Sequence, residues 1–178
     1  LVSNTSGGIL AFRTNASDIS ISAKTSGDSF PQMNAITSSG IDIYIDNKYL
    51  KSGWSKNGDL RLDISGLCQN LKEVEIYLPS YGDILDIEIR VNKGAELSEF
   101  KLPANIKILY YGSSITQGCC SSNPSLSYPS IIYRKNKLPF INLGFSGQGL
   151  GDEDIAYYIS EVEPSIIILD FWANPTVE

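Results

Sequence analysis

The sequence contains no histidine, only three cysteines and no long apolar run. Structural zinc sites combine cysteine and histidine in paired spacings such as C-x-x-C, and this chain lacks both histidine and that spacing. We therefore expect no metal site and no other cofactor. Cys119 and Cys120 are adjacent, and adjacent cysteines rarely bridge each other, so disulfides are neither implied nor excluded. No stretch approaches the ~20 apolar residues of a transmembrane helix, which predicts a soluble chain.

Positive charge is also scarce. Lysine and arginine number 14 against 20 aspartates and glutamates, which gives a formal net charge of -6 and a pI near 4.7. Proteins that bind nucleic acid or anionic membranes usually carry a basic surplus, so we expect neither as a partner. With 178 residues, 42% of them hydrophobic, the chain can bury a core in one large domain or two small ones. The oligomeric state stays open.

The first hundred residues alternate short β-like runs with clusters of Gly, Ser, Asn and Asp. In one run Ile19, Ile21 and Ala23 interleave with serines, the period-two pattern of a half-buried strand. The predicted strands are residues 9–13, 19–23, 41–45, 74–78 and 84–91. Many strands without a convincing helix predict a jelly-roll-like β-sandwich over residues 1–103.

The pattern changes after Pro103. Near-continuous apolar runs, typical of buried parallel strands, now alternate with helical segments. The predicted strands are 106–111, 140–143 and 166–171, and the predicted helices are 128–136 and 152–162. Residues 104–178 therefore form an α/β domain with only three strands, fewer than a doubly wound domain normally has. We expect the chain to be cut within this domain, and its start at Leu1 to follow a removed leader or strand.

Polar and glycine-rich segments follow each strand of this second domain, where open α/β sheets bind their ligands. They are residues 112–118 (GSSITQG), 142–149 (NLGFSGQG) and 170–175 (DFWANP). A hydroxyl, a glycine-rich turn with exposed backbone and a carboxamide would then lie at one site. Acyl transfer requires these groups: a nucleophile, exposed backbone N–H groups and a neutral donor for the developing oxyanion.

These three segments resemble the sequence blocks of the SGNH (GDSL-like) hydrolases. Residues 112–118 resemble the Gly-Asp-Ser nucleophile block, 142–147 the glycine block, and 172–174 the Gly-x-Asn block. Upstream, residues 40–44 resemble the Gly-x-Asp-Leu-Tyr motif of the β-rich domain in one bacterial branch, and 76–81 its Leu-Tyr-Leu-Pro stretch. The resemblance covers nearly the whole chain and implies a flavodoxin-like α/β/α hydrolase domain, of which residues 104–178 are the amino-terminal half.

The resemblance also implies residue roles. Ser114 would be the nucleophile, and the N–H groups of Ser114 and Gly147 with the Asn174 side-chain amide would form the oxyanion hole. Two departures, Ser113 in place of Asp and Trp172 in place of Gly, mark candidate substrate-binding residues, and Pro175 replaces a further Asp.

The family's base is a histidine in an Asp-x-x-His segment, which this chain lacks, so residues 1–178 alone should be inactive while the parent protein is active. The expected reaction is hydrolysis of small acyl esters such as acetates, with carbohydrate as a candidate alcohol. The expected location is the periplasm or outside the cell.

The same segments also have simpler interpretations. Ser113, Ser114 and Thr116 can simply cap a turn. The glycines of 144–151 can bind a dinucleotide pyrophosphate, although Asp152 would oppose a phosphate there. Ser146 imitates the G-x-S-x-G elbow of α/β-hydrolases, but Gln148 occupies the last glycine position.

A second class of function is a non-catalytic carbohydrate-binding or accessory module. Trp54, Tyr77 and Tyr81 are candidates for a sugar-binding face, with plain packing favoured for Tyr77. The thiols of Cys119 and Cys120 lack a histidine that would activate them.

Overall fold

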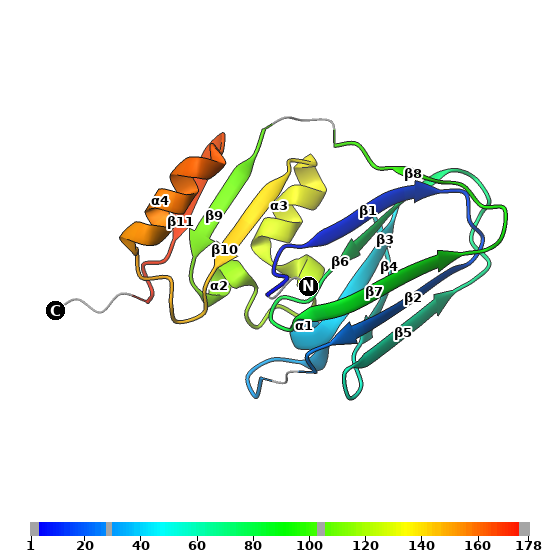
Figure 1. The fold of residues 1–178 in the computed structure, drawn as a ribbon, viewed down its shortest axis with the longest axis horizontal. Helices are drawn as coiled ribbons and strands as arrows, with labels where there is room; N and C mark the ends of the chain where they lie inside the picture. The colour runs from blue at the N-terminus through cyan, green and yellow to red at the C-terminus, as the bar shows by residue number, and fades with distance from the viewer. Residues whose placement is uncertain (1–3, 28–29, 103–105, 175–178) are drawn as a thin grey trace.

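The computed structural model describes residues 4–27, 30–102 and 106–174. A β-rich part lies beside an α/β part, with α3 between the strands of the two (Figure 1). No helix in these described ranges is long and apolar enough to cross a membrane. Within the same ranges, His, Cys, Asp and Glu side chains form no cluster that could hold a metal ion.

The β-rich part consists of two antiparallel sheets, one in the order β4-β3-β6-β1-β8 and one in the order β5-β2-β7. The elements are β1 (Ile9–Thr14), β2 (Ile19–Thr25), α1 (Ala35–Ser39), β3 (Gly40–Ile45), β4 (Lys48–Trp54), β5 (Asp59–Ile64), β6 (Lys72–Tyr77), β7 (Ile84–Val91) and β8 (Leu97–Glu99). All five strands expected here are present. β4, β5, β8 and the short helix α1, which begins at the Asn34 cap, were not expected.

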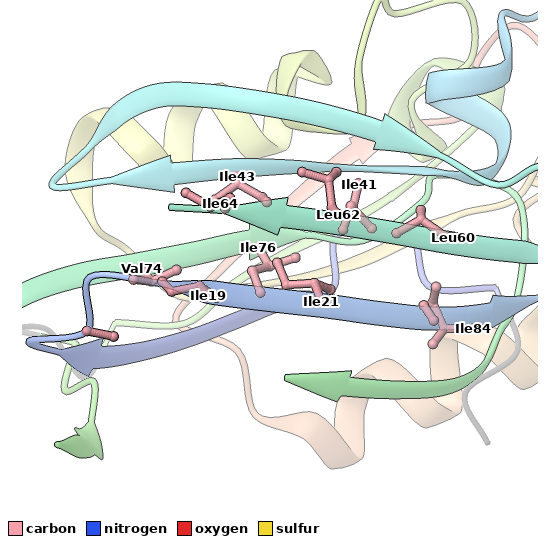
Figure 2. Packing of buried hydrophobic residues seen from close by; sticks show 12 residues of the cluster. Ile19, Ile21, Ile41, Ile43, Leu60, Leu62, Ile64, Val74, Ile76 and Ile84 are labelled. Atoms are coloured by element: carbon pink, nitrogen blue, oxygen red, sulfur yellow. The ribbon is translucent and has the colours of Figure 1, made fainter. Parts of the chain in front are cut away.

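One apolar cluster fills the space between the two sheets. On β2 the buried positions Ile19, Ile21 and Ala23 alternate with more exposed serines, as the period-two pattern predicts. They pack with residues of the facing sheet such as Ile43 and Ile76 (Figure 2). Burial of these side chains provides the main apolar stabilisation of the β-rich part.

Strand β3 differs from its expected half-buried pattern. Ile41 and Ile43 face the apolar cluster, and Asp42 and Tyr44 on the other side of the strand are buried as well. The reason is that the 3₁₀ helix η1 (Pro124–Leu126) packs on this second face and bonds to it.

The α/β part contains a parallel sheet in the order β10-β9-β11, formed by β9 (Ile108–Gly112), β10 (Phe140–Gly144) and β11 (Ile166–Asp170). Three α-helices lie between these strands in sequence: α2 (Ser114–Gln117), α3 (Tyr128–Asn136) and α4 (Glu153–Val162). These helices allow the connections between parallel neighbours. The central strand β9 is buried along its whole length, as expected.

Strand β11 was predicted to be buried on both faces, and this prediction is wrong. Ile166, Ile167 and Leu169 are exposed, and Leu169 keeps 62% of its surface accessible. β11 lies at the edge of the described sheet, and Ile159 of α4 belongs to the apolar cluster formed with Leu109 and Tyr111 of β9.

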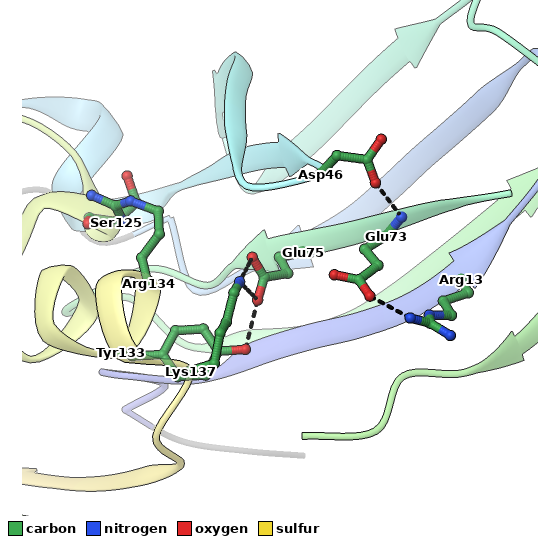
Figure 3. Close-up of polar contacts among 8 residues, drawn as sticks. All are labelled: Arg13, Asp46, Glu73, Glu75, Ser125, Tyr133, Arg134 and Lys137. Atoms are coloured by element: carbon green, nitrogen blue, oxygen red, sulfur yellow. Dashed lines mark hydrogen bonds and ion pairs between the residues drawn. The ribbon is translucent and has the colours of Figure 1, made fainter. Parts of the chain in front are cut away.

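The two parts are joined by the sheet–helix interface, which we define as the contact of β3 and β6 with η1 and α3. Glu75 of β6 is 1% exposed and accepts hydrogen bonds from the Tyr133 hydroxyl at 2.6 Å and from Lys137 Nζ at 2.8 Å (Figure 3). The guanidinium of Arg134 lies 4.7 Å from the Tyr44 ring centroid and donates to the Ser125 carbonyl. Polar and cation–π contacts of this kind fix α3 on the sheet.

Asp42 completes the same interface. Its carboxylate is fully buried and accepts hydrogen bonds from the Ser125 N–H and the Asn123 amide at 2.9 Å each, and from the Ser52 hydroxyl. A buried carboxylate is costly unless donors surround it, and three donors surround this one. Asp42 therefore holds the segment that leads from α2 to α3.

Candidate active site

The carboxyl ends of the three parallel strands meet at one edge of the sheet. Gly144 of β10 and Asp170 of β11 both pair in register with Gly112 of β9. Each of the three segments singled out in the sequence contains one of these paired positions. They are therefore neighbours at one edge, as expected of a binding site in an open α/β sheet.

The segment after β9 forms a tight turn into α2. Ser113 caps the helix, because its hydroxyl accepts a hydrogen bond from the Ile115 N–H at 3.3 Å. Ser113 is buried, so this side chain serves the turn and offers no exposed surface to a substrate. Ser113 therefore caps the turn, as the plainer interpretation of this segment predicts.

Ser114 is placed differently. It is the first residue of α2, it is partly exposed, and among the described residues no atom is hydrogen-bonded to its hydroxyl. Its N–H is equally without a bonded acceptor in the described ranges, as first-turn N–H groups have no partner inside a helix. Ser114 therefore presents a hydroxyl and an N–H at the sheet edge.

Thr116 holds this turn in place. Its hydroxyl lies 3.0 Å from the Asp170 carboxylate, to which it donates, and 3.0 Å from the Tyr128 hydroxyl. Burial raises the pKa of Tyr128 to about 12, so its hydroxyl stays protonated and can donate to Thr116. The chain of hydrogen bonds links α2 to β11 and to the start of α3.

The glycine loop, which we define as residues 145–149 directly after β10, has one N–H without a bonded acceptor among the described residues. The N–H of Ser146 donates to Gln117 Oε1, and those of Gln148 and Gly149 donate to the Phe145 carbonyl. Within residues 145–149, only the N–H of Gly147 lacks a bonded acceptor among the described residues. Gly147 is exposed and has φ +70°, a backbone conformation that favours glycine.

The glycines of this loop meet different demands. A Cβ at Gly147 would point into open space, so its backbone angle rather than crowding by protein atoms requires glycine there. A Cβ at Gly149 would instead clash with the Gly112 carbonyl oxygen. This close approach brings the loop onto the end of β9, next to the Ser114 turn.

Asn174 reaches the same loop from β11. Its side-chain amide lies 3.4 Å from the Gly149 carbonyl and 3.5 Å from the Phe145 carbonyl. Both distances are at the long limit for hydrogen bonds, so a better acceptor would compete for these N–H groups. Trp172, two residues earlier, is 80% exposed and packs little on the protein. Pro175 lies outside the described residues.

Two residues of the site were not anticipated as such. Asn142 donates to the Thr116 carbonyl at 2.8 Å and accepts from the Gly144 N–H, which ties the glycine loop to α2. Gln117 accepts from the Ser146 N–H at 2.9 Å and donates to Asn4 in the β-rich part at 3.0 Å. Their amide side chains at strand and helix ends were the only sequence signal for these roles.

Family models match both parts of the chain. A model described as the N-terminus of SGNH hydrolase-type esterases matches residues 1–97, more than half of the 178, and one of the GDSL-like lipase/acylhydrolase family matches residues 105–178. The chain belongs to the SGNH-type esterase family. The resemblance drawn from the sequence blocks is thereby confirmed. No curated protein sequence matches the chain significantly.

Several solved protein structures share the fold of this chain. The crystal structure of a protein described as a GDSL-like lipase, from Bacteroides ovatus, aligns with a TM-score of 0.91 at 28% identity and covers 97% of this chain and 53% of that one. The salicylyl-acyltransferase SsfX3 from a tetracycline biosynthetic pathway aligns at 0.80 with 23% identity, covering 96% and 49%. A family two carbohydrate esterase from Clostridium thermocellum, in complex with cellohexaose, aligns at 0.66 with 15% identity, covering 93% and 59%. The chain spans about half the length of the first two.

Proposed function

We propose that the protein is a serine esterase that hydrolyses small acyl esters, acetates foremost, with Ser114 as the nucleophile. One observation carries the proposal. At the edge where three strand ends meet, Ser114 and Gly147 each present an N–H without a bonded acceptor among the described residues, while most neighbouring N–H groups are used. The weakly held Asn174 amide lies over the same loop. Donors of this kind stabilise the oxyanion of acyl transfer.

The proposed reaction has two steps. Ser114 Oγ attacks the ester carbonyl carbon while its proton passes to a base, and the carbonyl oxygen becomes an oxyanion near the N–H groups of Ser114 and Gly147 and the Asn174 amide. Collapse breaks the bond to the alcohol oxygen, which takes the proton back from the base, and leaves an acyl-serine. Water then attacks the acyl carbon, and the acid is released.

The base is proposed to be a histidine outside residues 1–178, because these residues contain none and the chain spans about half of its solved relatives. A serine hydroxyl is a poor nucleophile at neutral pH without a base. Residues 1–178 alone are accordingly expected to show little activity.

The experiment compares the full-length protein with its Ser114→Ala variant in hydrolysis of 4-nitrophenyl acetate. We expect Ser114→Ala to lower kcat by at least about 10⁴-fold, because removal of a nucleophile abolishes the covalent route. The matched control is Ser122→Ala, which removes an exposed hydroxyl after α2 and should leave kcat within about twofold, like most surface substitutions. Unchanged turnover in Ser114→Ala would refute the assignment.

The same proposal covers fold and location. Residues 1–103 would be a jelly-roll-like β-sandwich, and residues 104–178 the first half of a flavodoxin-like SGNH domain. Separate apolar clusters between the two antiparallel sheets and beside β9 support this division. Trp172 would line the mouth of the site. Export to the periplasm or beyond belongs to the proposal and is tested by cell fractionation.

The second candidate, an independent sugar-binding module in residues 1–103, has weaker support. Asp42 and Glu75 are buried against η1 and α3, so separation of the parts would expose both carboxylates and leave the Ser52 hydroxyl as the one remaining donor among those described above. The aromatic face considered from the sequence is also not assembled. Tyr77 is buried among Tyr44 and Tyr133, which confirms packing for it, whereas Trp54 is half exposed on β4.

A further inference from the structure

Cys119 and Cys120 follow the Gly118 cap of α2 and place their sulfur atoms in contact. The two Sγ atoms are 3.0 Å apart, closer than two sulfur atoms that only touch, and a disulfide bond would need about 2.05 Å. In an extended chain, successive side chains point to opposite sides. Cys120 instead has φ +60°, in the left-handed region that non-glycine residues rarely adopt, and the two thiols face each other.

Hydrogen bonds anchor the backbone on both sides of this pair. On one side, the N–H of Cys119 donates to the Ser114 carbonyl at 2.8 Å. On the other side, the Ser121 carbonyl accepts a hydrogen bond from the Thr37 hydroxyl of the β-rich part at 2.5 Å. Because the segment is anchored at both ends, a change in its geometry must be taken up at one of them. One of the two is the turn that carries Ser114.

The two thiols differ in their access to solvent. Cys120 is exposed, whereas Cys119 is partly buried. Burial raises the pKa of the Cys119 thiol, so this thiol keeps its proton at neutral pH. Thiolates are the species that attack disulfides, and access decides which thiol is reached first. A small disulfide in solution therefore meets Cys120 first, with Cys119 beside it as the second thiol.

We propose that Cys119 and Cys120 form a thiol–disulfide exchange site, at which a low-molecular-weight disulfide such as oxidised glutathione converts the pair to a vicinal disulfide. The Cys120 thiol loses its proton to water, and its sulfur attacks one sulfur of oxidised glutathione. One glutathione leaves as a thiolate and is protonated. The Cys119 sulfur then attacks Cys120 Sγ, and its proton passes to the second glutathione as it leaves. Two protein thiols are oxidised, and one glutathione disulfide is reduced to two thiols.

This vicinal disulfide would be easily reduced. Consecutive Cα atoms lie about 3.8 Å apart across a trans peptide, below the separation of about 4.4–6.8 Å that is usual for disulfides. The bond would therefore strain the 119–120 segment, and strained or exposed disulfides are the labile and regulatory ones. The strain would act on the Cys119 N–H and so on the Ser114 carbonyl. Oxidation should then weaken the esterase activity, a step that rests on the proposed function of Ser114.

The test treats the reduced full-length protein with excess oxidised glutathione, alkylates the remaining thiols and determines the masses of the tryptic peptides. The pair lies in the tryptic peptide 108–134, and Cys68 lies in the tryptic peptide 62–72. Peptide 108–134 should lose two hydrogen atoms in most molecules, whereas Cys68, an exposed free cysteine, should only gain glutathione. Glutathione on 108–134 without loss of two hydrogens, or a cross-link to another peptide, overturns the proposal.

Two single variants check the pairing of the thiols. Cys119→Ser removes the second thiol and should trap glutathione on Cys120, so that peptide 108–134 gains mass instead of losing two hydrogens. Cys68→Ser is the matched control, because it removes an exposed thiol elsewhere and should leave the loss of two hydrogens at 108–134 unchanged. Absence of glutathione from the Cys119→Ser peptide would show that Cys120 is not the attacking sulfur and would overturn the proposal.

Hydrolysis of 4-nitrophenyl acetate provides a separate readout. Oxidation of the pair should lower kcat about fivefold, the size of one typical hydrogen bond, and dithiothreitol should restore it. The double variant Cys119→Ser/Cys120→Ser should not respond to oxidised glutathione. Equal kcat in the two redox forms, or an equal response of the double variant, overturns the link to the Ser114 turn. Failure of the proposed function looks different, because the mass changes would remain while hydrolysis would not depend on Ser114.

Discussion

The sheet–helix interface and the carboxyl edge of the parallel sheet use polar groups in opposite ways. At the interface, Asp42 and Glu75 are buried, and each accepts hydrogen bonds from several donors at 2.5–2.9 Å. At the edge, Ser114 has no hydroxyl partner among the described residues and Asn174 makes only two long hydrogen bonds. Satisfied polar groups stabilise the native state, whereas unsatisfied ones leave capacity for a ligand. Substitutions at the two regions should therefore separate stability from activity.

The largest effect is expected at the edge. Asn174→Ala removes one proposed oxyanion donor and should lower kcat of the full-length protein for 4-nitrophenyl acetate by about a hundredfold to a thousandfold. Because the two hydrogen bonds of Asn174 are long, the midpoint of thermal unfolding should change little.

Asn136→Ala is the matched control for this substitution. It removes an exposed carboxamide that donates to the Ile132 carbonyl within α3, away from the edge. Its kcat should match that of the unmodified protein. A large fall in the unfolding midpoint of Asn174→Ala, with kcat preserved, would reverse the expected contrast between the regions.

At the sheet–helix interface we expect a loss of stability rather than of kcat. Asp42→Ala leaves the Ser125 N–H without its acceptor and removes the shared acceptor of the Asn123 amide and the Ser52 hydroxyl. The free energy of unfolding should fall by about 3 kcal/mol, the sum of several modest losses of buried donors, and denaturant titration measures it.

Asp59→Ala removes a carboxylate of the same kind from an exposed pair with Lys24 and should cost less than about 1 kcal/mol. If the two aspartate variants were equally stable, the hydrogen bonds of the buried Asp42 carboxylate would not be what holds the two parts together.

The sequence predicted the elements whose own pattern is strong. The strand at 19–25 and the helix at 128–136 were found because alternation and helical spacing are local signals. The strand Asp59–Ile64 carries an equally clear alternation, D-L-R-L-D-I, and could have been predicted from it. Lys48–Trp54 could not, because an edge strand with largely exposed side chains has no apolar period.

The candidate site was predictable in location but not in its supports. Residues directly after parallel strands can be placed at one edge from the sequence alone, whereas the choice of Ser114, Gly147 and Asn174 within these segments came from the family resemblance. The burial of Asp42 and Glu75 depends on contacts with residues 58 to 83 positions away. No local pattern reports such contacts, so the role of these carboxylates became visible only in the structure.

Gln117 belongs to both regions and tests how far they can be separated. Its side chain holds the Ser146 N–H of the glycine loop and donates to Asn4 and to the Ser80 carbonyl of the β-rich part. Gln117→Ala should lower kcat for 4-nitrophenyl acetate about tenfold with KM nearly constant, because misplacement of the Gly147 N–H weakens only transition-state binding.

Ser6→Ala provides the comparison for Gln117→Ala, because the Ser6 hydroxyl donates to the backbone carbonyl of Gln117 at 2.6 Å without reaching the glycine loop. Ser6→Ala should lose about 1 kcal/mol of stability, the contribution of a typical hydrogen bond, and Gln117→Ala, which loses three, should lose about 3 kcal/mol. Only Gln117→Ala should lose kcat. If Ser6→Ala lowered kcat as much, the effect would come from general loosening between the two parts, and Gln117 would have no specific part in positioning the oxyanion loop.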